Sequence, residues 1–417
     1  MDRVHAGQDQ DGLTKIASDE GWFFNPFDPE VHADPYPTYK RLRDTDPVHQ
    51  SPFGGLILTR YSDMARVLRD PTMSSDFRNV ELPFDVVQGP AQQLEDRQPS
   101  MLFLDPPDHD RLRNLVHKAF TARRIEHLRS KVVEVVDDLI ARGREKGELD
   151  LVTDFAYPLP VAIICDLLSV PLEDQEIFRS WSRDLVQTLD PIVTQDTMHR
   201  ALESADAFKD YFRDLLESRR KHPQDDLLSA LIAAEDEGNK LTEEELLVTL
   251  TLLLVAGHET TVNLISNGML ALLQNPREWQ RLVDEPTLIR SAVEELLRYD
   301  SPVQFVARIP LEDMQIDGHQ VEKHHEIVCI LGAGNRDPQQ FPEPDRLDIA
   351  RRDNKHLAFS AGTHFCLGAS LARLEGQIAI SALAEQMPDI EPATLAPERR
   401  PTVTLRGLEK LPVKTGS

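Results

Sequence analysis

The sequence has few cysteines, no long apolar run and a shortage of positive charge. Its 417 residues contain three cysteines, Cys165, Cys329 and Cys366. They are too few and too far apart for a disulfide framework or a zinc cluster, and such sparse use is typical of a reducing, intracellular compartment. The 46 Lys and Arg against 71 Asp and Glu give a formal net charge of −25. This charge argues against non-specific binding to nucleic acid or to an anionic membrane surface.

The apolar segments are too short to predict a membrane anchor. Residues 1–20 are polar and mixed in charge, without the apolar core of a signal peptide. The most apolar stretch, 246–257, is about half as long as the roughly 20 residues that a membrane-spanning helix needs. We therefore expect a cytoplasmic protein and interpret this stretch as a buried helix.

Most of the chain predicts helix. Apolar residues recur at three- and four-residue spacing in the segments 119–139, 201–220, 242–274 and 286–299. Strand patterns are short and lie at 55–59, 326–331 and, weakly, 403–405, whereas the proline-rich segment 337–344 is irregular. The simplest organisation is a polar N-terminal tail at 1–20, one mostly helical domain with a small sheet at 21–412, and a C-terminal tail at 413–417.

The predicted helix at 242–274 is unusually long. Thr242 and Glu245 form a capping-box pattern at its start, and Asn275–Pro276 ends it. At 1.5 Å per residue it spans roughly 50 Å, which indicates a helix that organises the core. The polar island 258–261 interrupts its most apolar part, and a carboxylate buried there, at Glu259, is costly without a partner or a function.

A cysteine between two glycines precedes another helical pattern. The segment 359–368 reads Phe-Ser-Ala-Gly-Thr-His-Phe-Cys-Leu-Gly, and 369–385 has helical spacing. The dipole and unpaired N–H groups of a helix N-terminus favour a thiolate at Cys366, and glycines let a flat ligand approach the backbone. This geometry suits a metal held by one sulfur. Taken alone, Cys366 would more often be a buried apolar cysteine.

This segment resembles the haem-binding loop of cytochrome P450 enzymes, Phe-Gly-x-Gly-x-His/Arg-x-Cys-x-Gly, with Ser360 at a usual glycine position. The resemblance implies haem b with Cys366 as the axial thiolate ligand of its iron. It also implies that His364 contacts a haem propionate and that Phe359 packs near the thiolate. Gly368 completes the cofactor-binding loop.

The polar island of the long helix adds a second resemblance. The segment 256–261 is similar to the family's oxygen-activation motif, Ala/Gly-Gly-x-Asp/Glu-Thr-Thr/Ser. The small residues Ala256 and Gly257 let the helix lie close to a flat cofactor, and a carboxylate beside a hydroxyl can relay protons. The resemblance implies Glu259 as the acid and Thr260 as the oxygen-side hydroxyl. The alternative is a helix kink in which threonine hydroxyls bond their own backbone.

Three further features agree with the family. His109 and Arg113 share a helix face, and the resemblance implies that they bind a haem propionate. The alternative for these two residues is an ordinary basic amphipathic helix. The resemblance also implies that Arg308, on a strand, binds a propionate. Glu295 and Arg298 form an i, i+3 pair, which by itself is usually a solvated surface pair. The resemblance implies a buried structural network that Arg346 completes.

The segment 109–131 is locally basic. It carries seven cations against Asp110 and Glu126, a local charge of 7 − 2 = +5; the cations are Arg111, Arg113, Lys118, Arg123, Arg124, Arg129 and Lys131. This is either a solvated basic helix or a docking patch for an acidic partner. In the family this helix lies where electrons enter, so the resemblance favours docking of an acidic ferredoxin or flavodoxin-like carrier.

The resemblance covers roughly 21–412 and implies the mostly α cytochrome P450 fold, a triangular prism of helices with a small β region. The implied activity is monooxygenation, in which one atom of O2 is inserted into an apolar small molecule by hydroxylation or epoxidation. We expect a monomer that binds no nucleic acid. By analogy, the pocket is lined from 73–98, 170–207, Leu252, Val255, Gln304, Phe305 and Thr404, which are mostly apolar.

Three other readings stay open at this point. One is a peroxide-driven haem-thiolate oxygenase, which needs no electron carrier. Another is a non-catalytic haem-thiolate protein that senses or carries a ligand. The third is a catalytically silent paralogue that is kept as a structural partner.

Overall fold

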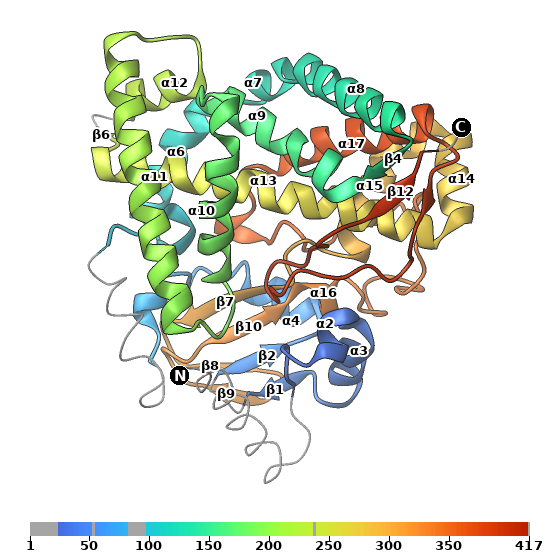
Figure 1. Ribbon diagram of the computed structural model, residues 1–417. Coiled ribbons are helices and arrows are strands. Elements are labelled where there is room, and N and C mark those ends of the chain that lie inside the picture. The colour runs from blue at the N-terminus through green and yellow to red at the C-terminus, as the bar shows by residue number, and fades with distance from the viewer. Residues whose placement is uncertain (1–23, 52–54, 82–96, 237–238, 416–417) are drawn as a thin grey trace, which may run out of the picture.

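A computed structural model describes residues 24–51, 55–81, 97–236 and 239–415 (Figure 1). The predicted tail at 1–20 and much of the segment 73–98 lie outside these residues. A helical part fills the upper half of Figure 1, and the strands and the first helices form the lower half. The molecule is therefore mostly α with a small β region, as the sequence predicts.

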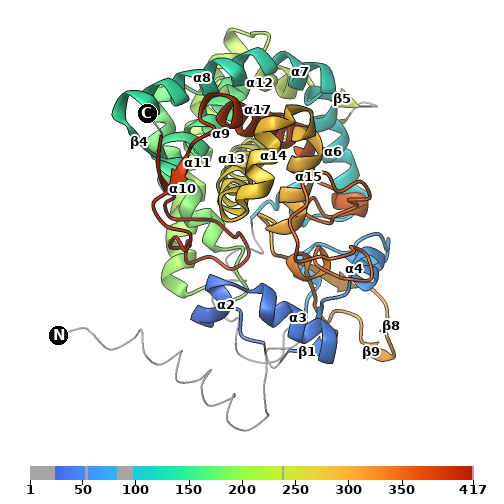
Figure 2. The ribbon, with the colours of Figure 1, turned by 90° about the vertical axis from the view of Figure 1, so that its right-hand side faces the viewer.

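One helix runs through the middle of the helical part. α13 spans Glu243–Gln274 and begins with the predicted capping box, in which Thr242 Oγ1 accepts from the Glu245 N–H and Glu245 bonds the Thr242 N–H. It is seen from the side in Figure 1 and close to along its axis in Figure 2. Gly268 and Gly376 bring neighbouring helices close, because a Cβ on either would lie 3.0–3.1 Å from a leucine side chain.

The remaining helices surround α13 on several sides. α9, α11, α15 and α17 pack directly against it. The long elements of this part are α6 (Asp108–Ala119), α7 (Ala122–His127), α8 (Arg129–Lys146), α9 (Pro158–Leu168), α10 (Gln175–Gln187), α11 (Gln195–Lys221), α12 (Leu227–Ala233), α14 (Pro276–Asp284), α15 (Ile289–Tyr299) and α17 (Ala369–Gln386). Between β4 and α9 lies η3 (Leu151–Ala156), a short π-helix.

The principal sheet has five strands in the order β1-β2-β10-β7-β3. β2 and β10 are parallel and the other neighbours are antiparallel. The bounds are β1 (Val48–Gln50), β2 (Leu56–Leu58), β3 (Met73–Ser74), β7 (Phe305–Pro310) and β10 (Ile327–Ile330), with α2 (Pro29–Ala33), α3 (Tyr36–Thr45), α4 (Tyr61–Val67) and α16 (Leu331–Gly334) nearby. A three-stranded sheet consists of β4 (Glu148–Asp150), β11 (Glu391–Pro392) and β12 (Pro412–Lys414). Two-stranded sheets pair β5 (Glu235–Asp236) with β6 (Asn239–Lys240) and β8 (Met314–Ile316) with β9 (His319–Val321).

Two helical stretches have the length and composition of a membrane span, but the fold buries them. Leu151–Leu168 and Glu243–Gln274 meet this criterion, and 72% and 61% of their most apolar windows are buried inside the protein. The second is α13, which places buried residues on all its faces after Thr261. Both stretches have the burial that is typical of core helices.

Several predicted boundaries differ from the structure. The expected helix at 119–139 is two helices, because the chain turns between α6 and α7 and again at Leu128, between α7 and α8. The expected strand at 403–405 contributes only an isolated bridge between Leu405 and Val303. Residues 413–415 do not form the predicted tail, since β12 pairs with β4 and Val413 is buried; residues 416–417 lie outside the described residues.

A fully buried ion network holds α15 to the loop that follows α16. Glu295 and Arg298 have no exposed side-chain surface and form two 2.8 Å bonds. The prediction that Arg346 completes this network is wrong. Arg346 is largely exposed, pairs with Asp348 and gives the network only its carbonyl oxygen. Arg351 takes its place, with Nε 3.0 Å from a Glu295 carboxylate oxygen.

Removal of Glu295 should strongly destabilise the protein. Glu295→Ala leaves Arg298 and Arg351 as buried charges without a carboxylate, which costs about 3–5 kcal/mol of the free energy of unfolding. Asp138→Ala is the control, because it breaks only the exposed Asp138–Arg142 pair and should cost less than about 1 kcal/mol. Urea unfolding measures both, and equal losses would contradict the account.

Candidate functional site

Cys366 lies in a tight turn before α17. The Cys366 N–H donates to the Phe359 carbonyl at 3.0 Å, which closes the loop around η6 (Gly362–His364). Gly362 has φ +69°, and a Cβ there would lie 2.2 Å from the Leu68 carbonyl oxygen. Ser360 also has positive φ, at +60°, which explains why glycine is the usual residue there. The serine keeps the glycine conformation.

The groups around Cys366 Sγ have opposite effects on the pKa of the thiol. Cys366 is exposed, and its sulfur lies beside the backbone N–H groups of Gly368 and Ala369 at the start of α17. Desolvation by the surrounding protein atoms raises the pKa of the thiol, while these N–H groups and the charges of Arg113 and Arg373 lower it, and desolvation prevails. The N–H groups and the two guanidinium groups therefore stabilise a thiolate that a bound metal would create.

Arginine and histidine side chains gather beside this loop from three elements. Arg113 of α6 donates to the Phe365 carbonyl at 2.6 Å, and the rings of His109 and His364 lie 4.3 Å apart. Burial, Arg308, His109 and Arg113 together lower the pKa of His364 to about 3. Within the described ranges Arg308 forms no salt bridge, although it is buried on β7. The four predicted propionate-binding side chains thus come together. His109 is paired with Asp110 at 2.9 Å and His364 is neutral at neutral pH, so the uncompensated positive charge is that of Arg113 and Arg308.

These residues fit haem. The guanidinium groups of Arg113 and Arg308, which form no salt bridge among the described residues, suit the two propionates of the cofactor, and a sulfur beside the backbone N–H groups of a helix N-terminus suits its iron. Phe359 is nearly buried, and the Arg373 guanidinium lies 4.5 Å from its ring centroid. The predicted loop residues are thereby assembled around one sulfur.

One face of α13 is accessible in an otherwise buried part of the helix. Leu252, Ala256 and Thr260 follow one another at four-residue spacing; Ala256 is exposed and the other two are half-buried. The Thr260 hydroxyl donates to the Ala256 carbonyl at 3.0 Å. Val255 is half-buried and packs against the main core. This face carries the predicted hydroxyl and part of the predicted substrate pocket.

Glu259 is turned away from that face and is held by an ion pair. Its Oε2 accepts from Arg400 at 2.6 Å, and its Oε1 lies 3.5 Å from His258 Nε2. Burial raises the pKa of this carboxyl, but His258 and Arg400 lower it to about 2. Glu259 is therefore ionised at neutral pH, with Arg400 as its partner.

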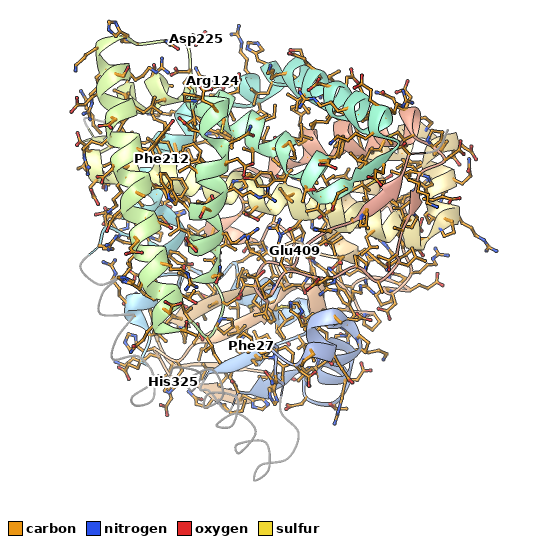
Figure 3. The ribbon with its side chains drawn as sticks, in the orientation of Figure 1. Phe27, Arg124, Phe212, Asp225, His325 and Glu409 are labelled. Carbon is orange, nitrogen blue, oxygen red and sulfur yellow. The ribbon has the colours of Figure 1, made fainter. Side chains whose placement is uncertain are left out.

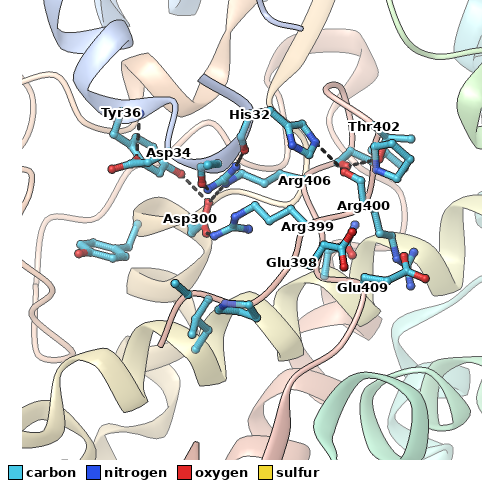
Figure 4. Close-up of a pocket in the computed structure, with 18 of the residues that line it drawn as sticks. His32, Asp34, Tyr36, Asp300, Glu398, Arg399, Arg400, Thr402, Arg406 and Glu409 are labelled. Carbon is cyan, nitrogen blue, oxygen red and sulfur yellow. Dashed lines mark hydrogen bonds and ion pairs between the residues drawn. The ribbon is translucent and has the colours of Figure 1, made fainter. Parts of the chain in front are cut away.

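A cleft reaches Glu259 from the surface. It has a volume of about 1330 Å³, and its lining includes Arg183, Glu259, Asn263, Arg400 and Thr402. Figure 4 shows Arg400 on the C-terminal segment between Thr402 and the carboxylates of Glu398 and Glu409. Cys366 does not line the cleft, so we interpret the cleft as a route for solvent to the carboxylate.

A second buried carboxyl lies where α13 crosses α17. Glu375 is almost fully buried, and burial raises its pKa to about 8, opposed only by a hydrogen bond with Thr261. It is therefore protonated at neutral pH. No local pattern in the sequence points to Glu375, Arg400 or Arg351, because each acts through a residue far away in the chain.

Two predictions for the substrate pocket are wrong. Gln304 Oε1 accepts from the Tyr39 hydroxyl at 3.1 Å, and the Phe305 ring lies 6.4 Å from the Tyr39 ring. Both side chains thus pack against α3 and are unavailable to a ligand. Thr404 donates to the Leu189 carbonyl at 2.8 Å, which attaches the C-terminal segment to the loop between α10 and α11.

Comparisons with known proteins agree with this site. The family model for Cytochrome P450 matches residues 54–386. The chain is 41% identical to Polyketide biosynthesis cytochrome P450 PksS of Bacillus subtilis, over 94% of the chain and 99% of the relative. It is 43% identical to Vitamin D(3) 25-hydroxylase of Pseudonocardia autotrophica, over 92% of the chain and 94% of the relative.

A solved structure shows the same fold. P450BioI, in complex with an acyl carrier protein ligated to hexadec-9Z-enoic acid, superposes with a TM-score of 0.86 at 39% identity, over 93% of this chain and 99% of that one. The chain belongs to the cytochrome P450 family. It is an oxidoreductase of the monooxygenase class, and proteins of this family hold haem through a thiolate.

The positive φ values in the cysteine loop predict opposite effects of two substitutions. Ser360→Gly should leave stability unchanged or raise it by up to about 1 kcal/mol, because glycine adopts this conformation without strain. Gly362→Ala should cost about 3 kcal/mol, since strain adds to the clash with Leu68. Urea unfolding of both variants checks this, and a tolerated Gly362→Ala would contradict the loop geometry.

Proposed function

We propose that Cys366 holds haem iron and that the protein inserts one oxygen atom from O2 into an apolar small molecule, by hydroxylation or epoxidation. The observation that carries the proposal is the arrangement of Cys366 at the start of α17, beside Arg113 and the buried Arg308, neither of which forms a salt bridge among the described residues. When bound, haem supplies the activation of O2. An external carrier of the ferredoxin type supplies the electrons.

The protein's own residues have separate tasks in this proposal. Arg113, Arg308, His109 and His364 bind the two propionates and fix the orientation of the cofactor. The accessible face of α13 limits the space above it, and Thr260 presents a hydroxyl there. Glu259 passes protons inward from the cleft.

The substrate class rests on the residues of this face and on the relatives. Leu252 and Val255 are apolar and half-buried. The names of relatives refer to polyketide biosynthesis and to vitamin D3, and one neighbour binds an acyl chain on a carrier protein. Each of these names an extended, largely apolar molecule, so we infer a substrate of that kind.

Turnover with isotope-labelled dioxygen tests the proposal. The holoprotein is incubated with NADPH, a ferredoxin, its reductase and a panel of fatty acids, terpenoids, steroids and macrolides under ¹⁸O2. We expect one labelled oxygen atom in a product. Product formed only with hydrogen peroxide would identify a peroxide-driven oxygenase, and ligand-induced spectral shifts without any product would identify a ligand sensor.

Thr260→Ala should uncouple the reaction. Loss of the hydroxyl should preserve haem and ligand binding, while product per NADPH falls about tenfold or more and hydrogen peroxide rises, because the proton relay is broken. Thr251→Ala is the matched control, since the Thr251 hydroxyl makes the same bond to the carbonyl four residues earlier. Unchanged coupling in Thr260→Ala would show that the assigned role is wrong.

We propose that the carrier docks beside α6, whose His109 and Arg113 contact the cysteine loop. Several of the predicted basic residues are already paired within the chain. Arg111 pairs with Glu245 and Asp108, and Arg124 donates to the Asp226 carbonyl and lies 3.5 Å from Asp225 (Figure 3). Arg111 therefore supports the fold and is a poor test residue.

Arg123 provides the cleaner test. It is exposed, and in the described part of the chain it has no salt bridge. Arg123→Glu should slow reduction by an acidic ferredoxin about tenfold at low ionic strength, and the difference should vanish in 1 M salt, where screening acts within about 3 Å. Arg142→Glu on α8 is the control. Equal rates for wild type and Arg123→Glu would exclude this docking site.

A further inference from the structure

His258 is a buried histidine whose protonation is constrained by its contacts. It is 1% exposed, and its Nδ1 lies 2.7 Å from the Leu254 carbonyl oxygen. A carbonyl oxygen only accepts hydrogen bonds, so Nδ1 carries a hydrogen. The protonation of His258 therefore varies only at Nε2.

Nε2 faces a carboxylate. It lies 3.5 Å from Glu259 Oε1, within ion-pair distance, and forms no hydrogen bond to any described residue. Without a proton between them, two lone pairs would oppose each other in a buried site, which is unfavourable. Glu259 Oε2 is taken by Arg400, so the proton between the two residues resides on Nε2 while Glu259 is ionised.

The other charged and titratable groups around the pair come from four segments. Tyr157, between η3 and α9, presents its ring edge to His258 at 5.9 Å. The Arg179 guanidinium of α10 lies 4.4 Å from the Tyr157 ring centroid, and Glu176 and Cys165 act on Tyr157 electrostatically. Arg400 belongs to the C-terminal segment. None of these groups bonds Nε2, and Glu259 is the only carboxylate of the described structure within 4.0 Å of it.

Only one residue of the His258–Glu259 pair is in contact with the cleft. Glu259 and Arg400 line the cleft, whereas His258 does not. Arg400 projects among the cleft-lining side chains in Figure 4. A proton on Nε2 is thus separated from solvent by Glu259, and a proton that arrives through the cleft meets the carboxylate first.

We propose that His258 is a positioning residue that stores a proton for Glu259, and that Arg400 keeps Glu259 ionised until this proton is used. In the transfer, the Nε2–H bond of the imidazolium breaks and an Oε1–H bond forms, so that both residues become neutral. Loss of the negative charge weakens the hold on Arg400 and opens the carboxyl to the cleft. After Glu259 has passed its proton inward, a hydronium ion in the cleft protonates the carboxylate again and leaves as water. This proton then moves from Oε1 to Nε2, which restores both the imidazolium and the carboxylate.

The storage of the proton is tested without turnover. Histidine side chains of the full-length holoprotein are labelled with ¹⁵N and observed by NMR in the diamagnetic ferrous carbon monoxide form, and His258 is assigned by its loss in His258→Gln. We expect both ring nitrogens of His258 to be protonated at pH 7, because Nδ1 donates to the Leu254 carbonyl and Nε2 faces the Glu259 carboxylate. In Glu259→Gln, which removes this charge, we expect the ring to be protonated at Nδ1 alone. A neutral ring in the wild type at pH 7 would overturn the proposal.

The use of the stored proton rests on the proposed function and has its own readout. His258→Gln and His258→Phe should lower product per NADPH several-fold at pH 8, with recovery near pH 6, and should raise the solvent isotope effect on coupling. Ser266→Ala, a buried change on the same helix, should alter neither. A pH profile that matches the wild type would overturn this step. Absence of product in the wild type would instead refute the proposed function and leave the NMR result intact.

Discussion

Two consecutive carboxylates on α15 hold the segment that carries Cys366. Glu295 binds Arg298 and Arg351 in a fully buried network at the start of that segment. Glu294 faces the other way and binds His356 and Arg373, on either side of the cysteine loop, and these contacts lower its pKa to about 2 against the effect of burial. The cysteine loop is thus attached at both ends to one rigid helix, which fixes the thiolate against α13.

An ion pair also determines how two neighbouring residues of α13 are oriented. Its accessible face presents the Thr260 hydroxyl, while Glu259, one residue earlier, points toward the cleft and Arg400. Neighbouring residues of a helix point about 100° apart. Thr260 therefore lies on the accessible face of α13, while Glu259 reaches the cleft. Glu375, neutral at the crossing with α17, adds no charge to this arrangement at neutral pH.

Local patterns in the sequence predicted the features that depend on residues close together in the chain. The capping box of α13, the turn at Cys366 and the pair Glu295–Arg298 depend on residues within a few positions of each other. Contacts that span the chain were missed or misassigned. Spacing in the sequence does not distinguish Arg346 from Arg351 as the partner of Glu295. Nor does the sequence show that the side chains of Gln304 and Phe305 pack against α3, and both were therefore predicted to line the substrate pocket.

The position of the thiolate is the claim on which the rest depends. The absorption spectrum of the dithionite-reduced holoprotein with carbon monoxide measures it directly. Thiolate ligation by Cys366 predicts a strongly red-shifted Soret band that is lost in Cys366→Ser and retained in Cys165→Ser and Cys329→Ser, whose cysteines are buried elsewhere. A band at the position of a neutral-ligand haem in the wild type, or a red-shifted band that survives in Cys366→Ser, would contradict the account.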